Sequence, residues 1–289
     1  MSRPTTGVLK IGTCSWNYDS WKGLVYSSPA RKAADYLPEY AARYQTVEID
    51  SWFYRIPDPA EALSYLEPVP DSFRFTCKVP QEITLTHLRG EGRTESQQPN
   101  KSFLSPPRFL AFLETVNSLL PRLDAIMFEF EYLNKQKMSS LQAFIERLGP
   151  FFEKAPAGLP YAIEPRNSNY LKTEYFQFLN AHGLIHVFSE KRFMPHVYEV
   201  YAEHPDLTAP SAVIRLLGGD RKEIEELTGQ KWNRLALPKD DKEKIVDMAC
   251  SLMDQGKMVT LNVNNHYEGS APMTIDSLAG LFRSRGIRI

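Results

Sequence analysis

Charged side chains stand at the ends of several short apolar runs, and their types are those used in acid–base chemistry. The carboxylates of Glu48, Glu129 and Glu164 could exchange protons with a substrate, and Lys78 could donate a proton or stabilise negative charge. Carboxylates placed among cations and apolar walls have pKa values that are pushed apart into acid and base roles. We therefore take these four residues as the candidate catalytic set.

Further side chains near the same run ends could hold a substrate. Paired guanidinium N–H groups suit an anionic group, and tryptophan-rich segments after the first two runs could stack on a sugar ring or a base. Each of these aromatic residues could equally well cap a hydrophobic core. The candidate binding residues are Arg166, Arg215, Asn264, Asn265, Trp16, Trp52, Tyr54 and His87.

For a metal, the sequence favours carboxylates over histidines. His87, His186 and His266 show no ligand spacing such as H-x-x-x-H, so a histidine-rich zinc site is not indicated. Carboxylate oxygens suit Mg²⁺ or Mn²⁺, which leaves the cofactor open with a carboxylate-bound divalent metal as one alternative. The carboxylates that could contribute are Glu48, Asp50, Glu129 and Glu164.

The elements that must position these residues are eight apolar runs that alternate with helical patterns. This alternation predicts an α/β fold, a (β/α)8 TIM barrel, for which ~250 residues is a typical length. We expect one domain over residues 1–289, with its site at the C-terminal ends of the strands. The runs are Val8–Ser15, Thr46–Trp52, Phe73–Val79, Ala125–Glu131, Pro160–Arg166, Leu184–Glu190, Ser211–Leu217 and Met258–Asn264.

Alternation within each run predicts which side chains face the barrel interior. In TVEIDSW, for example, Val47 and Ile49 face the helices and Glu48 faces inward. Buried ions must be paired, hydrated or bound to a ligand, so an internal salt-bridge network without chemistry is the alternative to a catalytic site. The polar residues with inward parity are Glu48, Asp50, Lys78, Glu129, Glu131, Glu164, Arg166, Arg215, Asn262 and Asn264.

Between the runs, Pro38, Pro106-Pro107 and Ser139-Ser140 mark helix starts, and three connections are longer than the others. The polar stretch Gln81–Ser105 could be a mobile loop over the site or an ordinary surface insertion. The other two, Lys191–Pro210 and Gly218–Pro238, follow strands and would lie at the barrel mouth. The Gly218-Gly219 pair could bind phosphate through backbone N–H groups.

The composition of the chain limits the classes of molecule that the protein is expected to bind. A formal net charge of -1 disfavours nucleic acid and anionic membranes as partners. Three widely spaced cysteines indicate neither a disulfide framework nor a metal clip, and no stretch approaches the ~20 apolar residues of a membrane helix. We expect a cytoplasmic protein with a small-molecule substrate, and the sequence leaves the oligomeric state open.

Six motifs in order along the chain resemble the DUF72 family, also called YecE-like. Its members are known as TIM barrels without an established activity, so the resemblance implies the fold and leaves the reaction open. The motifs are GTCSW (12–16), VEIDSWFYRIP (47–57), FRFTCKVPQEITLTH (73–87), IEPRNSNY (163–170), RLLGG (215–219) and NVNNHYEGSAPMT (262–274).

One segment departs from the family pattern. Where many members carry a Gln-x-Pro-Pro turn after the fourth strand, this chain has FEFEYLNK, so a role for Glu129 would belong to a subgroup. The residues on which the resemblance places more weight are Glu48, Lys78, Glu164, Arg166, Arg215, Asn264 and Asn265.

The leading hypothesis is an enzyme, a hydrolase, isomerase or lyase, that acts on a small polar or anionic metabolite, sugar-like or phosphorylated. Carboxylates would supply general acid–base catalysis, while Lys78 could alternatively form a Schiff base. The rival hypothesis is a non-catalytic module for nucleotides or nucleic acid that stacks bases on the tryptophan-rich rim. That module would contact phosphates through the long-loop cations Arg89, Arg93, Lys101 and Arg108. A barrel without activity is a third alternative.

Overall fold

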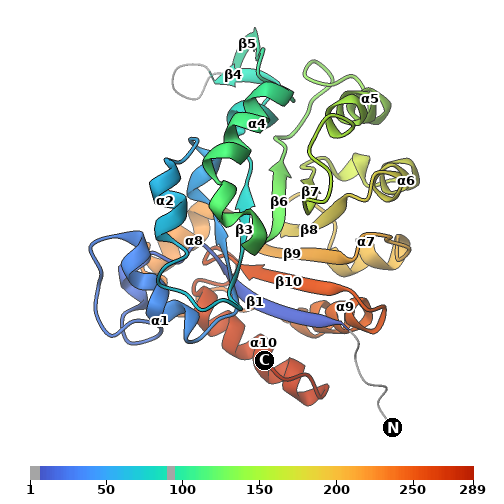
Figure 1. The fold of residues 1–289 in the computed structure, drawn as a ribbon. Helices are drawn as coiled ribbons and strands as arrows, with labels where there is room; N and C mark the ends of the chain where they lie inside the picture. Colours follow the sequence, from blue (N-terminus) through green and yellow to red (C-terminus); the bar gives the residue numbers. More distant parts are fainter. Residues whose placement is uncertain (1–6, 90–94) are drawn as a thin grey trace.

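A closed barrel of eight parallel strands forms the centre of the computed structural model, which describes residues 7–89 and 95–289. The strands follow one another around the barrel in the order β1, β10, β9, β8, β7, β6, β3, β2, with helices around the outside (Figure 1). The predicted (β/α)8 barrel is therefore confirmed. The strands are β1 Val8–Cys14, β2 Thr46–Ile49, β3 Arg74–Lys78, β6 Leu123–Glu129, β7 Tyr161–Glu164, β8 Ile185–Lys191, β9 Ser211–Gly218 and β10 Met258–Val263.

Strand register brings the polar residues to one level inside the barrel. Glu129 is paired with Glu164 across β6 and β7, and Arg215 lies opposite Ser189 on one side and Asn262 on the other. Adjacent side chains on each strand point outward, and Val47 and Ile49 are fully buried beneath the helices. The predicted parity therefore holds at these positions, because successive strand residues face opposite sides of the sheet.

Helices begin where the sequence signals placed them. Ser140 caps α5 by accepting a hydrogen bond from the Ala143 N–H at 3.0 Å, and prolines occupy the first turns of α1 and α4. No helix in residues 7–89 and 95–289 is long and apolar enough to cross a membrane. The α-helices are α1 Leu37–Ala41, α2 Pro59–Ser64, α3 Gln81–Thr84, α4 Pro106–Thr115, α5 Leu141–Phe152, α6 Thr173–Ala181, α7 Val197–Glu203, α8 Arg221–Thr228, α9 Lys242–Asp254 and α10 Ala271–Ser284.

The long connection at 81–105 is more ordered than a loop. It contains α3 and an antiparallel pair, β4 (His87–Arg89) and β5 (Glu95–Pro99), which stands beside α4 at the top of Figure 1. Its polar sequence gave no strand signal. The other two long connections hold α7 and α8, so they position side chains at the barrel mouth.

Two apolar clusters fill the protein. The larger one lies between the strands and the surrounding helices, and the smaller one fills the lower barrel interior below the charged level. The strand residues of the smaller cluster have the same inward parity as the charged residues. The barrel is therefore a packed core with a polar upper layer. The smaller cluster is Ala125, Met127, Ala162, Ile185, Val187, Ala209 and Val213.

Candidate functional site

Arg215 is the centre of the polar layer and is almost completely buried. Its Nε and Nη2 atoms donate to the two carboxylate oxygens of Glu48 at 2.7 and 2.6 Å. Its Nη1 donates to Glu164, and to Glu129 Oε2 at 3.2 Å. Glu164 also accepts a hydrogen bond from the Ser189 hydroxyl at 2.5 Å. One guanidinium on β9 thus connects this strand to β2, β6 and β7, and every carboxylate around it has a cationic partner.

Two further cations complete the layer on the side of the barrel mouth. Lys78 Nζ lies 2.9 Å from Glu129 Oε2, contacts Asp50, and stands 5.2 Å from the centre of the Phe53 ring. Arg166 Nη2 lies 2.8 Å from Glu129 Oε1 and 3.0 Å from Glu164 Oε1. Glu129 therefore receives contacts from all three cations of the layer, whereas Glu48 and Glu164 lie deeper and have no exposed surface.

The pKa values of Glu48 and Glu129 in this layer are shifted in opposite directions. Burial raises the pKa of Glu48, and the opposing effects of Arg215 and Lys78 do not fully offset it. Burial acts on Glu129 too, but Lys78, Arg166 and Arg215 lower the pKa of this carboxyl well below its usual value. Burial opposes the charged form of Lys78, yet Glu129 and Asp50 raise the pKa of its amine above its usual value. An amine held in its charged form cannot form a Schiff base readily.

A cavity of about 650 Å³ opens above Glu129 and Arg166 at the barrel mouth. This volume is in the range of small-molecule sites. Its walls combine aromatic and apolar side chains with a few charges, as such sites commonly do. The lining residues are Phe53, Leu85, Glu129, Phe130, Glu131, Tyr132, Arg166, Ser168, Lys191, Arg192, Phe193 and Met194.

Two nitrogen donors on this cavity have no protein partner within the described part of the chain. Arg166 Nη1 is buried without a hydrogen bond, and the side-chain amine of Lys191, an exposed residue on the same cavity, makes neither a hydrogen bond nor an ion pair among the described residues. Desolvation at the mouth, followed by repulsion from Arg166, lowers the pKa of Lys191 to about 8. By contrast, Arg192 on the same wall is paired with Asp220. The cavity therefore presents one free guanidinium N–H edge and one free amine.

The tryptophan-rich rim is not a stacking surface, which corrects the prediction for Trp16 and Trp52. Both rings are buried, and their indole N–H groups donate to Ala33 O at 2.7 Å and to Glu61 Oε1 at 3.2 Å. They pack on Tyr65 in the core because the segments after β1 and β2 fold back over the barrel wall. The rival nucleotide-binding hypothesis thus loses the surface on which it depended.

The predicted amides also have structural roles. Asn265 is buried, and its Oδ1 accepts hydrogen bonds from Ala271 N at 2.9 Å and from the Trp21 indole at 3.3 Å, which fixes the start of α10. Asn264 Oδ1 accepts from His266 N at 2.9 Å and lies 2.7 Å from its Nδ1. Neither amide lines the cavity above Glu129.

Tyr54 and His87 lie at a neighbouring hollow of about 530 Å³ below the β4–β5 hairpin, which Arg108 also lines. Tyr54 is exposed, and His87 Nδ1 lies 3.0 Å from the Thr86 hydroxyl oxygen. Lys101 is exposed and does not line this hollow. Arg93 and the side chain of Arg89 lie outside the described residues.

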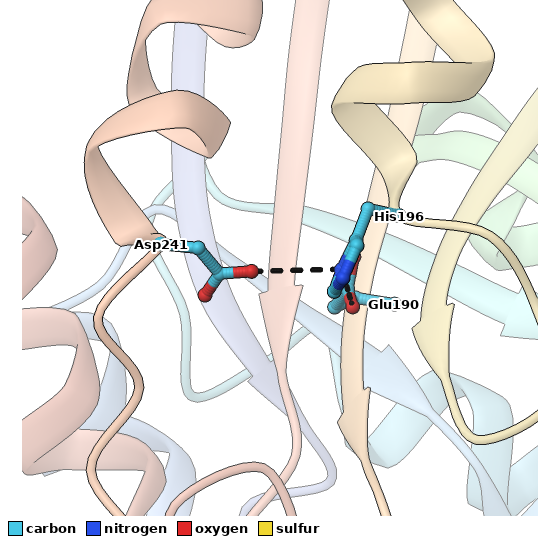
Figure 2. Close-up of side chains that lie close together, drawn as sticks. All are labelled: Glu190, His196 and Asp241. Carbon is cyan, nitrogen blue, oxygen red and sulfur yellow. Dashed lines mark hydrogen bonds and ion pairs between the residues drawn. The ribbon is translucent and has the colours of Figure 1, made fainter.

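The four carboxylates expected to hold a metal face cations instead. Within the described residues, the only group of three or more histidine, cysteine or acidic side chains close enough for one ion is Glu190, His196 and Asp241. In Figure 2 dashed lines join the His196 imidazole to Glu190, which overlaps it in this view, and to Asp241. This group was not predicted from the sequence, because His196 and Asp241 are far apart along the chain.

Several residues that line the cavity were also not predicted from the sequence. Phe193 is 83% exposed, has a left-handed φ of 67°, and lies with its ring centre 4.7 Å from the Arg192 guanidinium carbon. Tyr132 is exposed on the same cavity. The available signal was the position of KRFM directly after a strand, which places Lys191 and its neighbours at the barrel mouth.

Comparison with known proteins agrees with this architecture. The chain is 23% identical over 258 residues to UPF0759 protein YecE of Escherichia coli K12, covering 80% of this chain and 84% of that protein. A DUF72 family protein from Thermotoga maritima superposes with a TM-score of 0.68 at 20% identity over 97% of this chain and 100% of that chain. One from Enterococcus faecalis gives 0.67 at 20% identity over 96% of each.

The model of the family described as "Protein of unknown function DUF72" matches residues 10–288. The six motifs on which the resemblance rested all fall inside this range. The chain therefore belongs to the DUF72 family.

Proposed function

We propose that the protein is an enzyme that binds a small anionic metabolite, sugar-like or phosphorylated, in the cavity at the barrel mouth and transfers protons to or from it. The observation that carries this proposal is the pair of free donors on one cavity, Arg166 Nη1 and the Lys191 amine. A buried donor without a partner costs about 1 to 3 kcal/mol. An anionic oxygen between Arg166 and Lys191 would remove that cost.

Proton transfer would use Lys191 and Glu129, which line the same cavity. An amine with a pKa of about 8 changes protonation near neutral pH, which is the range in which general acid–base catalysis is most effective. Glu129 is ionised while Arg166 and Lys78 hold it. A substrate anion that draws Arg166 away would raise the pKa of Glu129 and make it a better base.

The deeper residues would position this pair. Glu48, Glu164 and Arg215 are buried beneath the cavity and already satisfy one another, so they form an ion network of the kind proposed as the alternative to catalysis. Lys78 does not line the cavity either, and it reaches substrate only through Glu129. Proton transfer would therefore take place at the rim of the network, and the buried residues at its centre would support the residues of the rim.

The test is ligand-dependent thermal unfolding with inorganic phosphate, sugar phosphates, sugar acids and uncharged sugars. A ligand at ~100 times its dissociation constant stabilises a protein by ~2.7 kcal/mol, which is readily measured. We expect anionic compounds to raise the unfolding temperature and uncharged sugars of equal size to have less effect. Any compound that binds is then assayed for turnover, which Glu129→Gln should abolish while binding persists.

Arg192→Gln is the matched control for Arg166→Gln, because Arg192 lines the same cavity but is already paired with Asp220. We expect Arg166→Gln and Lys191→Ala to remove the anion-dependent shift and Arg192→Gln to retain most of it. A shift that is equal in all three variants, or the absence of a shift with every anion, would contradict the proposal.

A further inference from the structure

A second hollow, of about 250 Å³, adjoins the first and shares its wall from Lys191 to Met194. Glu190, His196 and Asp241 meet here from three elements. Glu190 lies near the end of β8, His196 directly precedes α7, and Asp241 directly precedes α9. Figure 2 shows Glu190 directly beside the imidazole of His196, and Asp241 facing the same imidazole from the start of α9.

We propose that Glu190, His196 and Asp241 bind a divalent first-row transition-metal ion, Zn²⁺ or Mn²⁺, at the barrel mouth. This inference goes beyond the enzyme proposal and does not depend on it. It assigns a ligand to residues that the anion-binding cavity does not use.

The spacing of the donor atoms supports this site. His196 Nδ1 lies 2.9 Å from Glu190 Oε1 and 3.5 Å from Asp241 Oδ2, and all three donor atoms lie within 4.8 Å of one another. Donors bound to one ion at ~2.0 to 2.2 Å stand roughly 3 to 3.5 Å apart. The two contacts of His196 Nδ1, at 2.9 and 3.5 Å, match this spacing, and the two carboxylate oxygens lie within 4.8 Å of each other.

A hydrogen bond alone accounts for only part of this arrangement. Nδ1 of an imidazole carries at most one proton, so it can donate to one carboxylate at a time. Glu190 takes the shorter contact, and its other oxygen accepts from Val197 N at 3.0 Å. Asp241 Oδ2 faces the same nitrogen at 3.5 Å. A cation at the centre would satisfy both carboxylates together.

Tyr267 supplies an independent indication of a ligand. Its side chain is 2% exposed and lines this hollow, and its hydroxyl has no hydrogen-bond partner among the described residues. Buried hydroxyls without partners are uncommon. A water or ligand oxygen bound near a metal ion would accept a hydrogen bond from the Tyr267 hydroxyl.

The donor set selects the kind of ion and leaves it accessible. Imidazole with two carboxylates suits Zn²⁺ or Mn²⁺ better than Mg²⁺ or Ca²⁺, which prefer oxygen alone. Three protein ligands leave at least one position for water or substrate, as in catalytic sites. The His196 side chain is 48% exposed, so an ion can enter from solvent. The Tyr198 ring stacks on the His196 imidazole with 5.0 Å between the ring centres and 7° between the ring planes, which fixes the plane of the imidazole.

The test is calorimetric titration of untagged protein, treated with EDTA and dialysed, with Zn²⁺, Mn²⁺ and Mg²⁺. We expect one saturable site per chain for Zn²⁺ or Mn²⁺ and no comparable binding of Mg²⁺. His196→Ala and Asp241→Asn should each weaken binding by at least about tenfold, a loss of the size seen when metal-site residues are changed. Thermal unfolding in EDTA checks that both variants fold.

Asp240→Asn is the matched control, because it makes the same charge change one residue away at an exposed position. It should bind the ion as the unmodified protein does. The Co²⁺ complex should show visible ligand-field bands that change in His196→Ala, which reports imidazole coordination directly. Absence of saturable binding, or an affinity in His196→Ala and Asp241→Asn that is unchanged from the unmodified protein, would overturn the assignment. Arg166→Gln should keep metal binding, so this site and the anion cavity can fail separately.

Discussion

Arg215 and Glu48 are joined by two parallel charge-assisted hydrogen bonds of 2.7 and 2.6 Å, although 167 residues separate them in the sequence. Both side chains are almost completely buried. Such a bidentate contact fixes the relative position of β2 and β9 inside the barrel. It also supports Glu129, which contacts both Arg215 and Arg166.

Arg215→Ala should therefore be strongly destabilising. Removing one partner of a buried ion pair leaves an uncompensated charge, which costs about 3 to 5 kcal/mol. Chemical denaturation should show this loss in the free energy of unfolding. Arg221→Ala is the comparison, because Arg221 pairs with Glu225 at the surface of α8 and should cost under about 1 kcal/mol. Similar losses in both variants would argue against the buried network.

Gly218 and Gly219 should respond differently to alanine. Gly218 has a φ of +89°, and an added Cβ would lie 2.1 Å from the His266 carbonyl oxygen, whereas one at Gly219 would meet nothing within 4 Å. Left-handed strain costs about 1 to 3 kcal/mol, and the backbone overlap adds to it. Denaturation curves should show a large loss for Gly218→Ala and a small one for Gly219→Ala. The reverse order would contradict this account of the Gly-Gly pair.

Trp52 and Tyr54 form a second matched pair. Trp52 has no exposed surface, whereas Tyr54 is 61% exposed two residues later. Trp52→Ala should lower the free energy of unfolding by about 3 to 5 kcal/mol through loss of buried surface. Tyr54→Ala should change it by less than about 0.5 kcal/mol, as surface substitutions do. Equal effects would show that the ring of Trp52 is not packed in the core.

The lowered pKa of Lys191 predicts that stability rises with pH in an alkaline window. This pKa is about 8 in the folded protein and ~10.4 in an unfolded chain, so between these values the unfolded state binds more protons. The free energy of unfolding contributed by Lys191 should therefore increase from pH 8 to pH 10. Denaturation of the unmodified protein and Lys191→Gln at several pH values isolates this contribution.

Lys222→Gln serves as the control for that measurement, because it removes an exposed amine on α8. Its unfolding free energy should follow the unmodified protein across the window. If Lys191→Gln also runs parallel to the unmodified protein, the amine of Lys191 is not desolvated at the barrel mouth.

The sequence by itself determined the barrel and the inward side of the strands that carry Glu48, Lys78, Glu129, Glu164, Arg215 and Asn262. Alternation is a local property of an extended chain, so Glu48, Lys78, Glu164 and Arg215 could be assigned to the interior without any knowledge of their neighbours. The position of the charges at the run ends placed them near the C-terminal rim. Family motifs pointed to the same fold, and the closed strand order confirmed it.

Tertiary structure alone decided which charges pair, which aromatic rings are exposed and where two loops meet. Tryptophan has the same local pattern whether it caps a core or stacks on a ligand, and only the packing of the segments after β1 and β2 buried Trp16 and Trp52. His196 and Asp241 are brought together by the starts of two helices that no local pattern relates. Contacts of this kind depend on long-range register, which local residue preferences do not encode.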